Sequence, residues 1–206
     1  MTTPLSTVPS GVILVLRTDD REAAAAAARA AARGGIDAVE ITLTVPDAVG
    51  LIAELGDLGV PLGVGTVLSS DQVAPSVAAG ASFIVAPGTN AEVIRAAQDH
   101  DVPMIAGALT PTEVETAHRL GSAAVKVFPA GSVGGPLYIG ELKGPLPHIP
   151  LVVSGGVTRK TAPSYFAAGA HAVCVGRDLF TSDALARRDI DELALEARRF
   201  LQALGS

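Results

Sequence analysis

Short apolar runs rich in valine, isoleucine and alanine recur along this chain at nearly even intervals, and each run stops at a glycine, a proline or a polar residue. Continuous apolar runs of this length are typical of strands buried on both faces of a parallel sheet. We expect eight strands, which are Val12–Leu16, Ala38–Leu43, Pro61–Thr66, Ser82–Ala86, Val102–Ala106, Ala123–Phe128, Pro150–Ser154 and Ala172–Val175.

Helical segments separate these runs. Thr18–Asp20 and Gly34–Gly35 are start and stop signals for a helix over Arg21–Arg33. Further helices are expected from Pro46, over Ser70–Ala79 and Asn90–His100, from Thr110, over Leu137–Leu142, from Thr158 and over Ile190–Leu204. The alternation predicts a (β/α)₈ TIM barrel, as a single domain over residues 1–206. A doubly wound open sheet is the alternative, but the first strand–helix turn lacks a glycine-rich dinucleotide fingerprint.

Composition limits the function classes. Of the 206 residues, 49% are hydrophobic and 17% are charged, which is enough for a large core. A net charge of −6 argues against nucleic-acid binding. The single cysteine, Cys174, fits a reducing compartment. Met1–Ser10 lacks signal-peptide features, and no apolar stretch approaches the ~20 residues of a membrane span. We therefore expect a soluble, cytoplasmic protein without a membrane partner.

One lysine, Lys126, lies inside the sixth apolar run. Lysine is almost never fully buried without a reason. Burial disfavours the ammonium form, so we expect a lowered pKa and a nucleophilic amine that can form a Schiff base with a ketone. Alternatively, Lys126 reaches water from the strand end or pairs with a carboxylate. The local sequence leaves both interpretations open.

A glutamate lies inside the second apolar run. Glu40, Thr42 and Thr44 alternate, so they share one face of that strand. In a barrel, Glu40 and Lys126 can face the same interior, where a carboxylate beside an amine suits Schiff-base chemistry. A buried ion pair without chemistry is the alternative.

Glycine-rich turns follow the last two strands. Ser154-Gly155-Gly156 and Gly176 occupy the usual phosphate-binding position of barrels, and Arg177 adds positive charge. Arg159 and Lys160 are expected in the first turn of the next helix, where cations are normally unfavourable. The four histidines lie near helix ends or before strands, away from this rim, so we expect no metal site.

Several motifs, in order along residues 11 to 180, resemble the 2-keto-3-deoxy-6-phosphogluconate / 4-hydroxy-2-oxoglutarate aldolase family. These are class I lyases that use a lysine Schiff base. The matching segments are Val39–Thr44, Gly63–Val67, Ala86–Gly88, Gly107–Pro111, Val125–Ala130, Lys143–Pro145 and Ser154–Val157.

The resemblance implies a metal-independent aldolase that splits a 2-keto-3-deoxy sugar acid into pyruvate and a phosphorylated aldehyde and needs no cofactor. It implies that Lys126 forms the Schiff base and that Glu40 is the acid/base. It also implies a homotrimer. The residues implied to bind substrate are Thr66, Pro87 and Phe128 around pyruvate, and Gly155, Gly156 and Gly176 around phosphate.

This chain departs from the family pattern in three places. Thr44 replaces an arginine that holds the pyruvyl carboxylate in many members, and Arg17 fits the arrangement of relatives with an arginine after strand one. Ser154 replaces a frequent threonine whose position helps read the sugar-acid configuration. Arg177 replaces a serine. Two other functions stay open: a different phosphosugar barrel enzyme, such as an epimerase or synthase that uses Glu40 alone, and a non-catalytic oligomeric scaffold.

Overall fold

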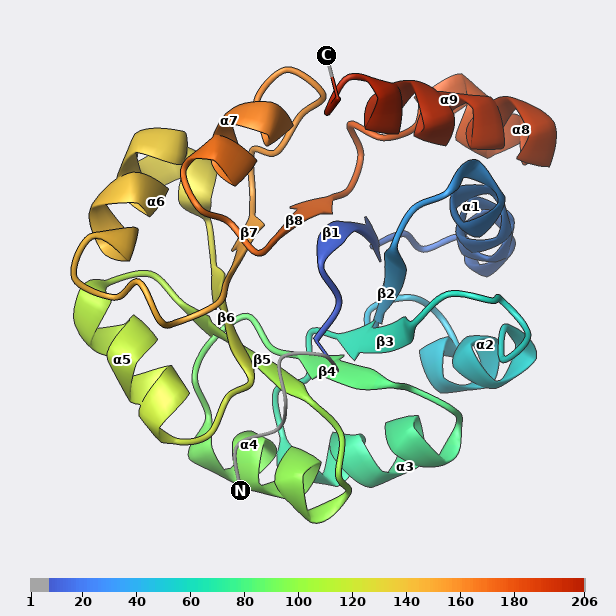
Figure 1. Ribbon diagram of the computed structural model, residues 1–206. Helices are drawn as coiled ribbons and strands as arrows, with labels where there is room; N and C mark the ends of the chain where they lie inside the picture. The colour runs from blue at the N-terminus through green and yellow to red at the C-terminus, as the bar shows by residue number, and fades with distance from the viewer. Residues whose placement is uncertain (1–7, 206) are drawn as a thin grey trace.

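The computed structural model describes residues 8–205 and contains a closed barrel of eight parallel strands paired in sequence order (Figure 1). The predicted (β/α)₈ barrel is confirmed. Its strands are β1 (Gly11–Leu16), β2 (Ala38–Thr42), β3 (Leu62–Gly65), β4 (Phe83–Val85), β5 (Met104–Ala108), β6 (Ala124–Val127), β7 (Leu151–Ser154) and β8 (Ala172–Val175).

Helices form a ring around the barrel (Figure 1). The cap signals work as expected at α1, where the Asp20 side chain accepts a hydrogen bond from the Ala23 N–H at 2.9 Å and Gly35 adopts a left-handed φ of 93°. The helices are α1 (Arg21–Gly34), α2 (Ala48–Glu54), η2 (Ser70–Gln72), α3 (Val73–Ala78), α4 (Ala91–Asp99), α5 (Pro111–Arg119), η3 (Ala130–Val133), α6 (Pro136–Lys143), α7 (Ala162–Ala167), α8 (Ser182–Arg187) and α9 (Ile190–Gln202).

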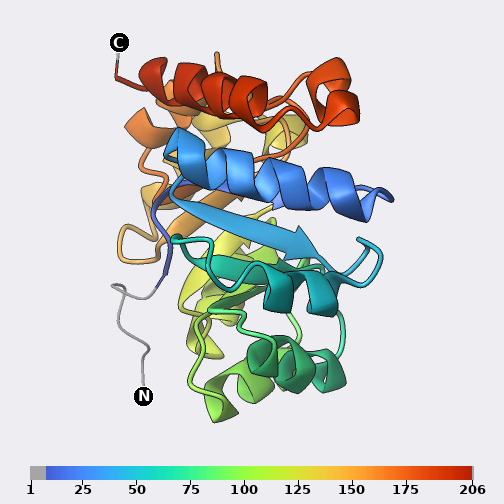
Figure 2. The same ribbon diagram turned by 90° about the vertical axis from the view of Figure 1, so that its right-hand side faces the viewer.

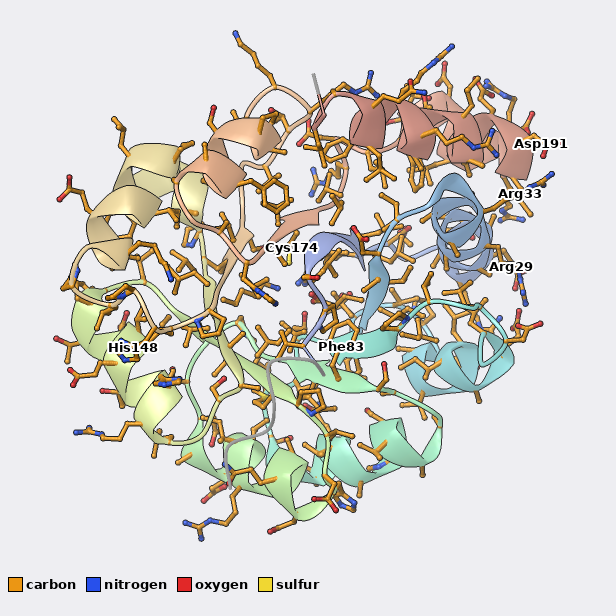
Figure 3. All side chains as sticks on the ribbon, in the orientation of Figure 1. Arg29, Arg33, Phe83, His148, Cys174 and Asp191 are labelled. Carbon is orange, nitrogen blue, oxygen red and sulfur yellow. The ribbon has the colours of Figure 1, made fainter. Side chains whose placement is uncertain are left out.

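Alternate strand residues fill two separate apolar clusters. One cluster lies inside the barrel, and Figure 3 shows its members Phe83 and Cys174 near the barrel axis. The other packs between strands and helices, and it includes Val39 and Val125. Because side chains alternate along a strand, Glu40 points inward with Ala38, and Lys126 points inward with Ala124. Two charged groups thus enter an apolar interior.

The first and last helices of the ring, α1 and α9, lie side by side (Figures 1 and 2). A Cβ on Gly34 would lie 2.5 Å from the Cβ of Ala197, so only glycine permits this approach. Arg33 and Asp191 form an exposed ion pair at 2.7 Å on this seam (Figure 3). The contact closes the helical ring between the first and last helices.

Two helix predictions are wrong in detail, and one α-helix was not predicted. The helix expected from Thr158 begins at Ala162, after a turn held by hydrogen bonds between Thr158 and Thr161. The helix expected over Ser70–Ala79 begins as the 3₁₀ turn η2 before α3. A further helix, α8, precedes α9.

Two expectations concern membranes and export. Within residues 8–205, none of the helices combines the length and the apolar character that a membrane crossing needs. The expected absence of a signal peptide concerns Met1–Ser10, of which residues 1–7 lie outside the described part of the chain.

Candidate active site

Lys126 and Glu40 meet inside the barrel. Lys126 lies on β6 and is 7% exposed, and Glu40 lies on β2 and is 1% exposed. The Lys126 Nζ donates to the two carboxylate oxygens of Glu40 at 3.4 and 3.5 Å. Within the described chain each side chain has only the other as a hydrogen-bond partner. The structure therefore brings together the two residues singled out from separate strands.

The pKa of Lys126 shifts opposite to the sequence-based expectation. Burial acts to lower the pKa of this ammonium, but the neighbouring Glu40 carboxylate raises it, and the net shift is upward. The expectation of a lowered pKa is therefore wrong for the resting pair, because it considered burial without the partner's charge. Lys126 rests as an ammonium, and its amine becomes nucleophilic once a proton leaves Nζ.

Two glycines on β3 leave room for the inward side chains of neighbouring strands. A Cβ on Gly65 would lie 1.9 Å from the Oε1 atom of Glu40. A Cβ on Gly63 would lie 2.3 Å from the ring of Phe83. Both distances are far below van der Waals contact. Gly65 therefore leaves the space that the Glu40 carboxylate occupies, and Gly63 leaves the space that the Phe83 ring occupies.

Lys126 lies in the wall of a cavity of about 670 Å³ at the carboxyl ends of the strands. The predicted site residues that line it are Arg17, Thr66, Pro87, Lys126, Phe128, Ser154, Gly155, Gly156, Gly176 and Arg177. Glu40 does not line this cavity, but its carboxylate accepts a hydrogen bond from Lys126, which does line it. The cavity is also lined by Val15, Val157, Cys174 and Asp178, which were not predicted from the sequence as site residues. Of these, only Asp178 could have been predicted from the sequence, because it is a charged residue next to the predicted site residue Arg177.

Arg17 lines the cavity and is hydrogen-bonded to Thr66, which also lines it. Arg17 follows β1, and its Nη2 donates a hydrogen bond to Thr66 Oγ1 at 2.9 Å. Thr66 has a φ of 60°, which is unusual for a β-branched residue. Its neighbours are fixed by backbone bonds from Leu43 N–H to Gly65 O and from Val67 N–H to Val85 O. Strain of this kind is commonly held at functional sites.

The turn after β7 exposes backbone toward the same cavity. Gly155 and Gly156 adopt φ values of 86° and 78°, and the Gly131 N–H donates to Gly155 O at 2.9 Å. Arg159 and Lys160 precede α7, so the predicted first-turn cations are wrong, and neither lines the cavity. Arg177 is exposed and has no ion pair within the described chain. The positive charge at this end therefore comes from Arg177, with Asp178 beside it.

Cys174 lies deep in the cavity wall next to Ser154. Burial raises the pKa of its thiol to about 12, although the nearby Lys126 and a hydrogen bond with Ser154 act to lower it. A thiol with this pKa stays protonated at neutral pH and is a poor nucleophile. Cys174 is therefore a buried small side chain, as predicted.

The chain has two other lysines, Lys143 and Lys160. Lys143 donates to the Pro147 and Ile149 carbonyls at 2.8 and 3.0 Å, and burial lowers the pKa of its amine. Neither lysine lines the cavity. Among residues 8–205 no cluster of three or more histidine, cysteine, aspartate or glutamate side chains is placed to hold a metal ion.

The protein is a parallel barrel with a cavity at the carboxyl ends of its strands and a buried amine beside a carboxylate in the cavity wall. This is the arrangement of a barrel enzyme. The family model described as KDPG and KHG aldolase matches residues 7–195. The chain belongs to this family, and it is an aldolase.

Named relatives agree with this assignment. The chain is 37% identical over 167 residues to the 2-dehydro-3-deoxy-phosphogluconate aldolase of Pseudomonas aeruginosa, covering 80% of this chain and 76% of the relative. It is 34% identical over 197 residues to the 2-dehydro-3-deoxy-6-phosphogalactonate aldolase of Escherichia coli, covering 93% of each. A Legionella pneumophila KDPG aldolase, solved with pyruvate as a covalent carbinolamine, matches with a TM-score of 0.84 at 27% identity, covering 94% of this chain and 95% of that one.

Proposed function

We propose that Lys126 is the Schiff-base nucleophile and Glu40 the acid/base of an aldolase that cleaves a 2-keto-3-deoxy sugar acid to pyruvate and an aldehyde. The observation that carries the proposal is the buried contact between Lys126 Nζ and the Glu40 carboxylate, with Nζ in the cavity wall. A carboxylate at this distance can take a proton directly from the ammonium.

The chemistry begins when Glu40 accepts a proton from Lys126. The free amine attacks the C2 ketone, and the resulting carbinolamine loses water after Glu40 returns a proton to its hydroxyl. The protonated imine then accepts the electron pair of the C3–C4 bond while the Glu40 carboxylate takes the proton of the C4 hydroxyl. The aldehyde leaves, and Glu40 returns this proton to C3 of the enamine. Water finally releases pyruvate and restores Lys126.

The opposite ends of the cavity suit opposite ends of the substrate. Arg17 with Thr66 places a guanidinium and a hydroxyl near the amine, where the carboxylate of the 2-keto acid must lie. Pro87 and Phe128 line the space between. Ser154, Gly155, Gly156, Gly176 and Arg177 lie around the aldehyde end, and backbone N–H groups with a guanidinium suit a phosphate.

Borohydride trapping tests the covalent step. Reduction in the presence of pyruvate should add one pyruvyl group to the wild-type chain, and peptide mapping should place it on Lys126. Lys126→Ala should lose both the label and turnover. The exposed Lys160→Ala is the matched control and should keep both. An adduct on Lys143, whose amine is the one with a lowered pKa, would overturn the assignment.

The substrate is tested by pyruvate release from three 2-keto acids. We expect 2-keto-3-deoxy-6-phosphogluconate or its galactonate epimer to be preferred over 4-hydroxy-2-oxoglutarate, because Arg177 favours a phosphorylated aldehyde. Arg177→Ser should weaken the preference for phosphate, and a chelator should leave turnover unchanged. Equal use of the phosphorylated and unphosphorylated acids by the wild-type enzyme would contradict this role for Arg177.

We also propose a homotrimer of one-domain chains located in the cytoplasm. Leu137 and Leu68, on segments that follow β6 and β3, are 83% and 61% exposed, and exposed apolar side chains of this size suit a subunit contact. The buried free thiol of Cys174 suits a reducing compartment. Light scattering should give three times the 20.7 kDa chain mass. Cell fractionation and a single unfolding transition test location and domain number.

A further inference from the structure

Two threonines, one on β2 and one just after it, form a hydrogen-bonded pair beside β1, the strand that Arg17 follows. Thr42 is fully buried and shares the inward face of β2 with Glu40, while Thr44 is exposed at the rim. The Thr42 Oγ1 lies 2.9 Å from the carbonyl oxygen of Leu16 and 2.8 Å from the Thr44 Oγ1. The three groups form a short line from the rim to the end of β1.

The direction of these hydrogen bonds follows from counting protons. A backbone carbonyl can only accept, so Thr42 must donate its single hydroxyl proton to Leu16 O. Thr42 then has only lone pairs to offer, and Thr44 must be the donor in the bond between the two hydroxyls. The chain of bonds runs from Thr44 to Thr42 to Leu16.

This chain of bonds reaches the residue before Arg17. The strand pairing between β1 and β2 ends at Leu16 and Ile41, so the Thr42 hydroxyl adds one contact beyond the sheet. Arg17 is also held at its other end, where Nη2 donates to Thr66. The arginine is thus fixed at its backbone and at its guanidinium, from two different strands.

The same counting limits what Thr44 can do. Its proton is committed to Thr42, so it cannot also be donated to a substrate anion without breaking the chain of bonds. We propose that Thr42 and Thr44 are positioning residues that hold Arg17 where its guanidinium meets the carboxylate of the 2-keto acid. The proposal rests on the proposed function of Arg17.

The first test measures the pyruvate concentration that half-saturates borohydride labelling of Lys126. Thr42→Val removes the hydroxyl at nearly constant shape, and it should raise this concentration about tenfold, as expected for one lost hydrogen bond. The maximal labelling rate should change less. Thr42→Ser keeps the donor and should restore the wild-type value. Thr112→Val is the control, because Thr112 is exposed and has no side-chain hydrogen bond within the described chain.

A double-variant cycle separates positioning from general destabilisation. Arg17→Ala should itself raise the half-saturating concentration. If Thr42 acts through Arg17, adding Thr42→Val to that variant should cause no further rise. An equal rise in both backgrounds, or a failure of Thr42→Ser to rescue, would overturn the proposal. Thr44→Val at the exposed rim gives the same comparison should Thr42→Val fold poorly, and it should show a smaller rise in the same direction.

Failure of this inference can be told from failure of the proposed function. If wild-type protein gains no label from pyruvate and borohydride, the Schiff-base function and the positioning role both fall. If wild-type protein is labelled but Thr42→Val and Thr44→Val bind pyruvate as tightly as wild type does, only the positioning role is wrong.

Discussion

Two ion pairs of this protein have the same pattern of contacts and opposite surroundings. In the barrel, Lys126 Nζ approaches both oxygens of Glu40 at 3.4 and 3.5 Å, with side-chain exposures of 9% and 1%. On the surface, Arg188 Nη2 approaches both oxygens of Asp20 at 2.9 and 3.0 Å, with exposures of 47% and 42%. The shorter contacts belong to the exposed pair.

The difference shows that contact length does not rank the importance of ion pairs. Water screens the surface pair, so its short distance carries little free energy. The interior pair has no such screening, and each buried charge has only the other to compensate for the water it has lost. Moving one proton between Lys126 and Glu40 therefore changes the chemistry of the site, whereas the Asp20 pair only fastens α8 to the start of α1.

The largest effect on turnover is expected when Glu40 can no longer exchange protons with Lys126. Glu40→Gln keeps the shape of the side chain but removes its capacity to exchange protons, so turnover should fall on the order of 10²–10⁴-fold. Steady-state pyruvate release measures this loss. Glu115→Gln on the exposed face of α5 is the matched control and should be neutral. Near wild-type turnover in Glu40→Gln would assign proton transfer to another group.

A smaller loss of turnover is expected when the Glu40 carboxylate is displaced but chemically unchanged. Gly65→Ala places a methyl group 1.9 Å from the present position of Glu40 Oε1, so the carboxylate must shift. A misplacement of about 1 Å can cost on the order of 10²-fold in rate. Gly140→Ala in α6 is the control, because nothing lies within 4 Å of its added Cβ. Unchanged turnover in Gly65→Ala would show that the carboxylate position is not critical.

The interior pair should be costly to stability even though it is needed for activity. Replacing both charges, as in Lys126→Met with Glu40→Leu, should leave stability unchanged or raise it by about 1–4 kcal/mol. Either single change should be less stable than the double variant, because it leaves one buried charge unpaired. Urea unfolding at neutral pH measures the three variants. A double variant less stable than both singles would mean that the pair contributes net stability.

The sequence alone indicated much of this interior. Evenly spaced apolar runs predicted the strands, because parallel strands buried on both faces leave little room for polar residues. Lys126 and Glu40 were visible for the same reason, as charges inside such runs. Their contact distance was not, because 86 positions separate them and only barrel closure sets their approach. The upward pKa shift of Lys126 was missed for that reason.

Other features of the fold and the site could not be predicted from the sequence, because they depend on individual side-chain hydrogen bonds or on very short elements. The late start of α7 follows from side-chain hydrogen bonds between Thr158 and Thr161, which compete with helix formation. The helix α8 has only six residues, too short for a periodic pattern to reveal it. The role of Thr42 depends on the direction of one hydroxyl toward Leu16, which no residue pattern could give.

The smallest effect, a change in stability, is expected from breaking the surface pair of Arg188 and Asp20. This effect should depend on pH. Arg188 and the backbone N–H of Ala23 lower the pKa of the Asp20 carboxyl in the folded chain. A carboxyl with a lowered folded pKa stabilises the fold above its ordinary pKa of about 3.9, and this contribution is lost as pH falls through the lowered value. Arg188→Gln should therefore reduce stability slightly at neutral pH, and its gap from wild type should close in acid. Urea unfolding at several pH values measures this gap, with Asp20→Asn as the background in which Arg188→Gln should have no effect. A gap that stays constant into acid would mean that Arg188 acts through packing rather than through the Asp20 charge.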